Sequence, residues 1–293
     1  MSLTEQQLAE RHTGLGGSDA AAALGLSPYK SALELFLEKR ERREHSGPQL
    51  SAFRWGTLLE PVIRQEYANV TGRVVRLPEG TLRHPSFPFV IAHVDGVTDD
   101  KRVFEAKTAR TDTDWGKSGT DEVPHHYLLQ VQHYLAVTGL EVADIAVLIG
   151  GNDFRVYEVP ADLDLQEMIV DGEQEFWKLV EANTPPPPEW DCGDSVEIVQ
   201  RLFPGTDGTV LVAEKDDALY QQAFANATKR AKEYEQIAEG AKAHLLYSMG
   251  NAARMVFAES EMQLTRKLTQ RKGYAVPATE YIDSRFSKIK ETS

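Results

Sequence analysis

The sequence contains a single cysteine, Cys192, among 293 residues. One cysteine cannot form a disulfide within the chain, and it cannot supply the four thiolates of a structural zinc or iron–sulfur site. Long apolar runs are also missing, because no stretch approaches the roughly 20 residues that span a bilayer. The N-terminal sequence MSLTEQQLAER lacks the apolar core of a signal peptide. These absences predict a cytoplasmic protein without membrane contact.

An excess of positive charge is missing too, since the formal net charge is −13. A polyanionic partner would therefore have to meet local basic residues, because charges farther apart than a Debye length of about 8 Å are largely screened. The candidates for phosphate contact are Arg11, Lys30, Arg54, Arg64, Lys107, Arg110 and Lys117. A hydrophobic fraction of 41% is enough for one sizeable core with an accessory region.

A hairpin is predicted in the segments VIAHVDGV and RVFEAKTA. Residues 88–94 are apolar and β-branched, residues 99–101 carry a turn signal, and residues 103–108 have the composition of a returning strand. Side chains alternate between the two faces of a strand. We therefore expect Glu105 and Lys107 to share one face of this hairpin.

Asp95 is expected to lie beside these two side chains. Two converging carboxylates repel each other unless a hard cation lies between them, and oxygen ligands suit Mg²⁺ or Mn²⁺. A lysine on the same face can orient or deprotonate a water, or stabilise charge on a phosphate. The pattern of Asp95, Glu105 and Lys107 thus predicts a metal site, and its alternative is a solvated charged turn.

Two predicted helices carry further polar candidates. Residues 54–72 form an amphipathic pattern that includes Glu60, a possible third carboxylate. Residues 125–139 have apolar and aromatic residues at helical spacing, with Gln130 one turn before Tyr134. Gln130 is a candidate to hold a water or a phosphate. The ordinary alternatives are a first-turn acid for Glu60 and a polar surface residue for Gln130.

The segment RHTGLGGSDAAAALGLSPYKS places Ser18 before an alanine-rich helix, with Arg11 upstream. Ser18 is a candidate N-cap, and a helix N-terminus near an arginine can bind a phosphate. The alternative is that Ser18 caps the helix and has no other role. Trp115, in a Gly/Asp/Ser-rich loop, is a candidate either for stacking on a base or for packing.

Five ordered segments, RHTGLGGSDAA, WGTLLEP, HVDGV, FEAKT and YLLQVQHYL, span roughly residues 11–140. Together they resemble the YqaJ-type viral recombinase or lambda-exonuclease-like family of phage-type PD-(D/E)xK nucleases. The resemblance implies an α/β fold with a restriction-endonuclease-like core, in which a mixed central sheet is flanked by helices. It also implies hydrolysis of DNA with Mg²⁺, Mn²⁺ being possible.

Carried over by motif, the resemblance assigns roles to individual residues. The implied metal ligands are Asp95, Glu105, the carbonyl of Ala106 and Glu60. Lys107 is similar to the signature lysine, and Gln130 to the family's glutamine. Arg11 and Ser18 resemble the pair that grips the 5′-phosphate in exonuclease members. Gln132 is an alternative to Gln130, because a helix turns about 200° over two residues and only one can face the site.

The second half of the chain predicts a domain boundary. A hairpin at residues 145–159 and a helix at 163–182 are followed by TPPPPEW, a stiff spacer that cannot continue a helix. Residues 211–249 have the composition of a long helix, and short strands follow. This helix is a single element or, as the alternative, one arm of a coiled-coil-like hairpin. The predicted organisation is a nuclease domain (1–184), a Pro-rich linker (185–192) and a helical extension with short strands and a basic C-terminal end (193–293).

The hypothesis that follows from the resemblance is a 5′-to-3′ exonuclease acting on double-stranded DNA ends in phage or prophage recombination. Its implied setting is a bacterial or phage-infected cytoplasm. The implied partners are a single-strand annealing protein and further copies of the chain, as a trimer. The alternatives are a structure- or single-strand-specific endonuclease and a non-catalytic DNA-binding recombination accessory protein.

Overall fold

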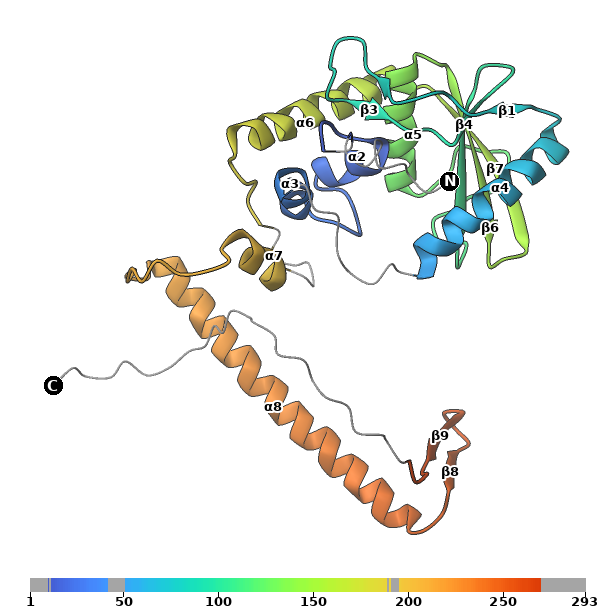
Figure 1. Ribbon diagram of the computed structural model, residues 1–293. Coiled ribbons are helices and arrows are strands. Elements are labelled where there is room, and N and C mark those ends of the chain that lie inside the picture. Colours follow the sequence, from blue (N-terminus) through green and yellow to red (C-terminus); the bar gives the residue numbers. More distant parts are fainter. Residues whose placement is uncertain (1–9, 11, 42–50, 189, 191–194, 270–293) are drawn as a thin grey trace. The chain divides into compact units, whose positions relative to one another are not determined.

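Figure 1 shows the computed structural model of the chain, which describes residues 10, 12–41, 51–188, 190 and 195–269. The chain divides into two compact units, residues 1–203 and residues 204–293. Arg11 and most of the basic C-terminal end lie outside the described residues. Within the described part of the chain, no helix is long and apolar enough to cross a membrane.

The boundary between the units falls after the proline-rich residues 185–192 rather than within them. The cause is the short helix α7 (Ser195–Leu202), which packs onto the first unit. Its Ile198 is buried in the same apolar cluster as Leu37 and Phe176. The proline run therefore separates two helices of one unit.

The first unit is built on a five-stranded sheet with the order β1-β4-β5-β6-β7. The central pair β5 and β6 is parallel, and every other pair is antiparallel, so the sheet is mixed. Gly150 and Gly151 form the turn of the predicted hairpin with φ of 59° and 83°, a region that favours glycine. The strands are β1 (Val75–Arg76), β4 (Gly96–Thr98), β5 (Val103–Ala109), β6 (Val142–Ile149) and β7 (Asp153–Pro160).

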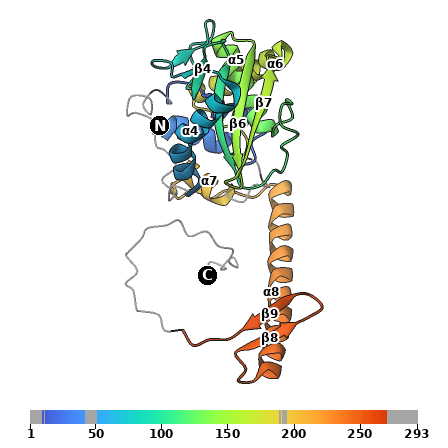
Figure 2. The same ribbon diagram turned by 90° about the vertical axis from the view of Figure 1, so that its right-hand side faces the viewer.

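Helices cover both faces of this sheet (Figures 1 and 2). On one face, α4 (Ser51–Thr71) packs Ile63 and Tyr67 against Phe104 of β5. On the other, α5 (His125–Thr138) packs against Val103. Two more helices, α2 (Gly17–Ala23) and α6 (Leu163–Ala182), pack against α5. A third, α3 (Ala32–Glu41), packs against α2 and α6. The predicted α/β class is confirmed.

The predicted hairpin partner of β5 is wrong. Residues 96–98, not 88–94, pair with β5, because the tight turn joins the strand that directly precedes it. Within 88–94, β3 (Ile91–Ala92) pairs with β2 (Leu82–Arg83) in a separate two-stranded sheet. The backbone of Leu15 also bonds this segment, through Phe89 and Ile91 at 2.7 and 2.9 Å. Asp95 consequently lies in the short connection from β3 to β4.

The second unit contains the long helix α8 (Lys215–Met249), which confirms the helix predicted over residues 211–249 (Figure 2). A β-hairpin follows it, with β8 (Arg254–Phe257) paired to β9 (Met262–Thr265). Among the described residues of this unit, α8 has no returning helix beside it. The coiled-coil-like hairpin considered from the sequence is therefore not formed within them.

Candidate active site

Strand β5 places Glu105 and Lys107 together, as the alternation of side chains predicted. Phe104 packs against α4, whereas Glu105 and Lys107 face α5. Lys107 Nζ donates to Glu105 Oε1 at 2.7 Å, and the Glu105 side chain is 4% exposed. The two charges are therefore paired in a mostly buried setting.

Asp95 joins this pair through the backbone of the same strand. Its Oδ2 accepts a hydrogen bond from the N–H of Ala106 at 2.9 Å, which fixes the carboxylate beside β5. Burial, and next the negative charge of Glu105, raise the pKa of Asp95 well above its usual range. Asp95 thus lies close enough to Glu105 for the charge of Glu105 to oppose the ionisation of Asp95.

One oxygen of this cluster lacks a partner. Glu105 Oε2 is buried, and no described residue makes a hydrogen bond to it. A buried carboxylate oxygen without a partner is costly. A divalent cation between Asp95 and Glu105 would satisfy it and would relieve the repulsion between the two side chains, so the donor set fits a hard metal ion.

Lys107 remains charged in this site. Burial acts to lower its pKa, but the charges of Glu105 and then Asp95 outweigh burial, so the pKa lies above its usual value. Its Nζ also lies 4.7 Å from the ring centroid of Tyr127, a cation–π contact. Sequence reasoning missed Tyr127, although its position three residues before Gln130 on a helix places both on one side of α5.

Glu60 does not complete a three-carboxylate cluster. Its Oε1 accepts from Arg64 at 2.9 Å, one turn along α4. Its charge contributes to raising the pKa of Asp95, but as the smallest of the named influences. In the part of the chain that the structure describes, no three Asp, Glu, His or Cys side chains gather as a metal-binding group.

Gln130 points into the candidate site and Gln132 away from it. Gln130 Nε2 donates to Glu105 Oε1 and to the Tyr134 hydroxyl, both at 2.8 Å, and its Oε1 accepts from Lys107 at 2.9 Å. Gln132 instead joins α5 to the start of α6, because its amide bonds the carbonyl of Pro160 and the side chain of Gln166. The geometry therefore favours Gln130 of the two candidates.

We expect Gln130→Ala and Gln132→Ala to separate activity from stability. Loss of a side chain that orients a metal ligand typically costs about 10- to 100-fold in activity, so Gln130→Ala should lower kcat by that factor. Gln132→Ala should lower the free energy of unfolding by about 1–3 kcal/mol, through unsatisfied buried groups, with kcat kept. DNA hydrolysis rates and urea denaturation of both variants check this. An equal loss of kcat in the two variants would contradict the assignment of Gln130, and not Gln132, to the candidate site.

The N-terminus of α2 differs from the prediction at Ser18. Gly16, not Ser18, is the N-cap residue, and Ser18 is the second residue of the helix with an exposed side chain. The carboxylate of Asp19 accepts from Gly16 N–H at 3.2 Å and is itself buried against Lys39 Nζ at 2.6 Å. Asp19 is thus the side chain that meets the first turn of α2, a role that sequence reasoning gave to Ser18.

Helix α2 also supports the candidate site through Gly17. A Cβ at this position would lie 2.5 Å from Cε1 of Tyr134, whose hydroxyl accepts from Gln130. Only glycine allows this approach, so Tyr134 is held against α2.

Gly17→Ala is expected to displace Tyr134 and, with it, Gln130. Overpacking of this kind costs about 1–3 kcal/mol, and we expect a lower kcat as well. Thermal denaturation and DNA hydrolysis would measure both effects. Gly56→Ala is the matched control, because its added Cβ would meet only Thr108 Oγ1 at 4.0 Å. If Gly17→Ala behaves like this control, the described contact has no effect on the site.

Trp115 packs inside the unit, so the packing alternative holds. Its side chain is 8% exposed and lies against the rings of Tyr127 and Tyr157, with centroids 5.6 and 5.1 Å away. The ring of Tyr127 in turn contacts Lys107. Trp115 therefore backs the candidate site and does not present a surface for a base.

The candidate basic contacts divide into two groups. Lys30 lies 2.8 Å from Glu38, and Arg64 is paired with Glu60. The remaining described candidates outside the candidate site are exposed, namely Arg54, Arg110 and Lys117. The exposed residues are the ones available for a phosphate backbone.

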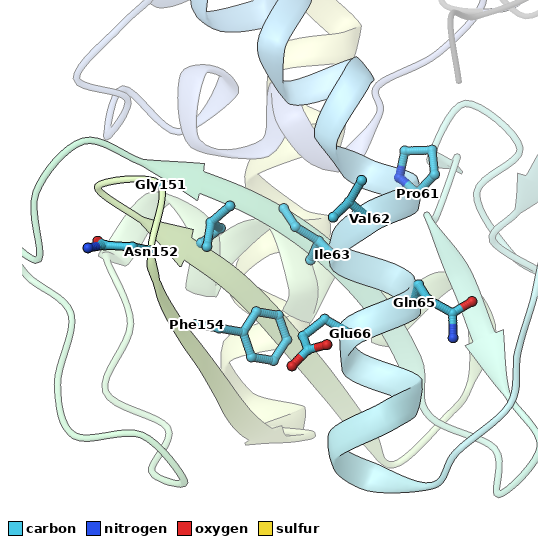
Figure 3. A pocket seen from close by; sticks show the side chains of 9 residues that line it. Pro61, Val62, Ile63, Gln65, Glu66, Gly151, Asn152 and Phe154 are labelled. Atoms are coloured by element: carbon cyan, nitrogen blue, oxygen red, sulfur yellow. The ribbon is translucent and has the colours of Figure 1, made fainter.

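A separate groove lies between α4 and the β6–β7 turn (Figure 3). It has a volume of about 620 Å³, and its lining includes Val62, Leu148 and Phe154. Neither Asp95 nor Glu105 lines it. The carboxylate cluster and this largely apolar groove are therefore distinct features of the first unit.

The first unit has a restriction-endonuclease-like fold, which places the carboxylates and the lysine of the candidate site together. The chain is similar to the crystal structure of an alkaline exonuclease, LHK-Exo, from Laribacter hongkongensis, with a TM-score of 0.51 and 22% identity over 62% of this chain and 94% of that one. A second structure, LHK-Exo in complex with dAMP, also has a TM-score of 0.51, with 21% identity over 69% and 98% of the two chains. The predicted restriction-endonuclease-like core is thereby confirmed.

The sequence comparisons agree with this fold. Residues 7–141 match the family described as the YqaJ-like viral recombinase domain. The chain is also 40% identical over 178 residues to the "Uncharacterized protein YqaJ" of Bacillus subtilis (strain 168). That match covers 59% of this chain and 55% of the relative, so the chain matches about half the relative's length.

Proposed function

We propose that the protein is a metal-dependent DNA nuclease, and specifically a 5′-to-3′ exonuclease on double-stranded ends in phage or prophage recombination. One observation carries the proposal: Asp95 and Glu105 converge beside Lys107 and Gln130, and a buried Glu105 oxygen is left for a cation. The YqaJ-like domain match and the exonuclease-like fold support the same reaction.

In this proposal Asp95 and Glu105 would hold Mg²⁺ or Mn²⁺, with the Ala106 carbonyl as a further ligand. Glu60 would join them only by leaving Arg64, with which it is paired at 2.9 Å. The cation, when bound, polarises the scissile phosphate and lowers the pKa of a bound water. Lys107 keeps its positive charge next to Glu105, so its ammonium can orient the attacking water and stabilise charge on the phosphate.

Gln130 holds the side chains of Glu105 and Lys107 in position. Its amide contacts both Glu105 and Lys107, so neither side chain can turn away from the other without losing a hydrogen bond. Tyr134 fixes the same amide from the far side. The cluster is therefore held in place before substrate arrives, which is what electrostatic catalysis requires.

Substrate binding is proposed to use exposed positive charge. Arg54, Arg110 and Lys117 are the available described residues, and Arg11 with Ser18 would bind the 5′-phosphate. By resemblance to the family, we propose a homotrimer and a single-strand annealing protein as partners in a bacterial cytoplasm.

The choice between exonuclease and endonuclease is tested on three substrates with Mg²⁺. These are linear duplex DNA with 5′-phosphates, the same duplex with 5′-hydroxyls, and a closed circle. We expect the protein to degrade only the linear DNA with 5′-phosphates. When EDTA removes the Mg²⁺, we expect no substrate to be degraded. Ser18→Ala should remove the preference for 5′-phosphate. Cleavage of the circle would replace the exonuclease by an endonuclease, and inertness toward every substrate would favour a non-catalytic DNA-binding role.

A further inference from the structure

A row of aromatic rings leads from the candidate site to the surface. Tyr127, whose ring contacts the Lys107 ammonium, lies against the ring of His126 with centroids 4.0 Å apart. Tyr29, in the segment between α2 and α3, meets the His126 ring edge to face, with centroids 5.2 Å apart and the planes at 88°. Successive ring contacts therefore connect Lys107 with Tyr29.

One nitrogen of His126 lacks a hydrogen-bond partner. Its Nε2 is buried, and no described residue makes a hydrogen bond to it. Burial, and next the positive charge of Lys107, lower the pKa of His126, so the ring is neutral at about pH 7. A buried polar atom without a partner is costly, whereas an apolar ring would make the same ring contacts without that cost. The position therefore favours a hydrogen-bond partner from outside the chain.

Tyr29 presents its ring to solvent. Its side chain is 75% exposed, although the His126 ring contacts it. The backbone N–H of Tyr29 donates to Ser27 Oγ at 3.2 Å, which holds the turn from which the ring projects. An exposed aromatic ring of this kind is a surface on which a nucleobase stacks, whatever the base, because every base has a π-face.

The surroundings of this pair suit a DNA strand. The carboxylate of Asp114 acts on the pKa of His126 in the opposite sense to Lys107, so the loop that contains Asp114 lies near the imidazole. The same loop carries the exposed side chains of Arg110 and Lys117, two of the proposed phosphate contacts. His126 thus lies near both the candidate site and a loop with exposed positive charge.

We propose that Tyr29 and His126 form a nucleotide subsite beside the candidate site, in which Tyr29 stacks on the terminal base of a bound DNA end and His126 Nε2 makes a hydrogen bond to the same nucleotide. Exposed side chains change rotamer within nanoseconds, so the Tyr29 ring can turn from the imidazole as the nucleotide binds. This inference rests on the proposed action on DNA ends and adds residues that would bind the end.

The first test measures DNA binding without hydrolysis. A linear duplex with 5′-phosphates and 2-aminopurine as the terminal base is titrated with the full chain in EDTA. Stacking quenches 2-aminopurine fluorescence, so we expect the wild type to quench it. Tyr29→Ala should abolish the quenching and raise the Kd about 5- to 150-fold, the value of one base–aromatic stack. Tyr29→Phe keeps the ring and should behave like the wild type.

Leu163→Ala is the matched control for Tyr29→Ala. Leu163 is also 75% exposed, and it begins α6, where the neighbouring Asp162 is bonded by Gln132 and not by the candidate site. We expect this control to quench 2-aminopurine and to bind the duplex like the wild type.

The second test uses His126→Phe, which removes Nε2 and keeps an aromatic ring. Because this nitrogen has no partner before DNA binds, thermal denaturation should give a Tm at least as high as that of the wild type. The Kd for the duplex should nevertheless rise at least about 10-fold, through the lost hydrogen bond to the nucleotide. A histidine with only a structural role would change the Tm and leave the Kd unchanged.

Absence of quenching by the wild type would overturn the subsite, and so would equal quenching and equal Kd in the wild type and Tyr29→Ala. If such a Tyr29→Ala protein still accompanies a wild type that degrades DNA with Mg²⁺, the subsite alone is wrong. Quenching that depends on Tyr29, in a protein that degrades no DNA, would support the subsite and contradict the nuclease activity alone.

Discussion

Glu105→Gln is expected to lower the rate of metal-dependent DNA hydrolysis at least about 10³-fold. A single electrostatic contact to a reacting group is worth about 10²–10³. This substitution removes more than one, because Glu105 is proposed to bind the cation and is paired with Lys107 at 2.7 Å. Single-turnover hydrolysis of linear duplex DNA would measure the effect.

Glu158→Gln provides the matched control for this substitution. Glu158 lies on strand β7 of the same sheet. Its half-exposed carboxylate is paired with Arg102 at 2.6 Å and not with Asp95, Glu105 or Lys107. We expect nearly wild-type hydrolysis from this control. A Glu105→Gln protein that remains folded and equally active would show that the carboxylate cluster is not the catalytic centre.

Glu173→Ala is expected to lower the free energy of unfolding of the first unit by about 3–5 kcal/mol, the usual effect of removing one partner from a buried ion pair. Glu173 and His133 are both fully buried, with His133 Nδ1 2.7 Å from the carboxylate. His133 Nε2 lies 2.8 Å from the carbonyl of Ile91, so both ring nitrogens face acceptors. Because Ile91 begins the strand that leads to Asp95, the pair also holds the candidate site.

The stability that the His133–Glu173 pair contributes should depend on pH, and the pKa of His133 sets the direction of that dependence. Burial lowers the pKa of His133, but Glu173 and the Ile91 carbonyl outweigh burial, so the pKa is raised. A raised folded-state pKa stabilises the fold fully below the unfolded value of about 6.5, and this stabilisation is lost as pH rises through the folded value.

The destabilisation by Glu173→Ala should therefore be larger at about pH 6 than at about pH 9 in urea denaturation. Glu175→Ala, on the same helix but exposed, should change stability by less than about 0.5 kcal/mol at either pH. A pH-independent effect of Glu173→Ala would mean that His133 is neutral in the folded protein.

Several elements could be predicted from the sequence because their causes are local. The helix predicted over residues 163–182 is α6, which begins after Asp162 accepts from the N–H of Leu165 at 3.0 Å and ends at Asn183 in a left-handed conformation. The common face of Glu105 and Lys107 follows from strand alternation alone. Gln130 and Tyr134 meet because they are one helical turn apart.

The remaining features depend on contacts between distant parts of the chain. Residues 88–94 were expected to pair with β5, but their backbone is bonded by Leu15 and β2 instead. The burial of Trp115 depends on Tyr157, 42 positions away, and the place of Ile198 depends on α3. Periodicity reports which side of an element is apolar, but it does not identify the element that covers it.

The central claim is that Asp95 and Glu105 hold a divalent cation, and binding of Mn²⁺ followed by electron paramagnetic resonance tests it most directly. The account predicts that the wild-type protein binds Mn²⁺ and that Mg²⁺ competes for the same site. It also predicts that a folded Asp95→Asn/Glu105→Gln protein has lost this binding. Equal Mn²⁺ binding by the wild type and the double variant would contradict it.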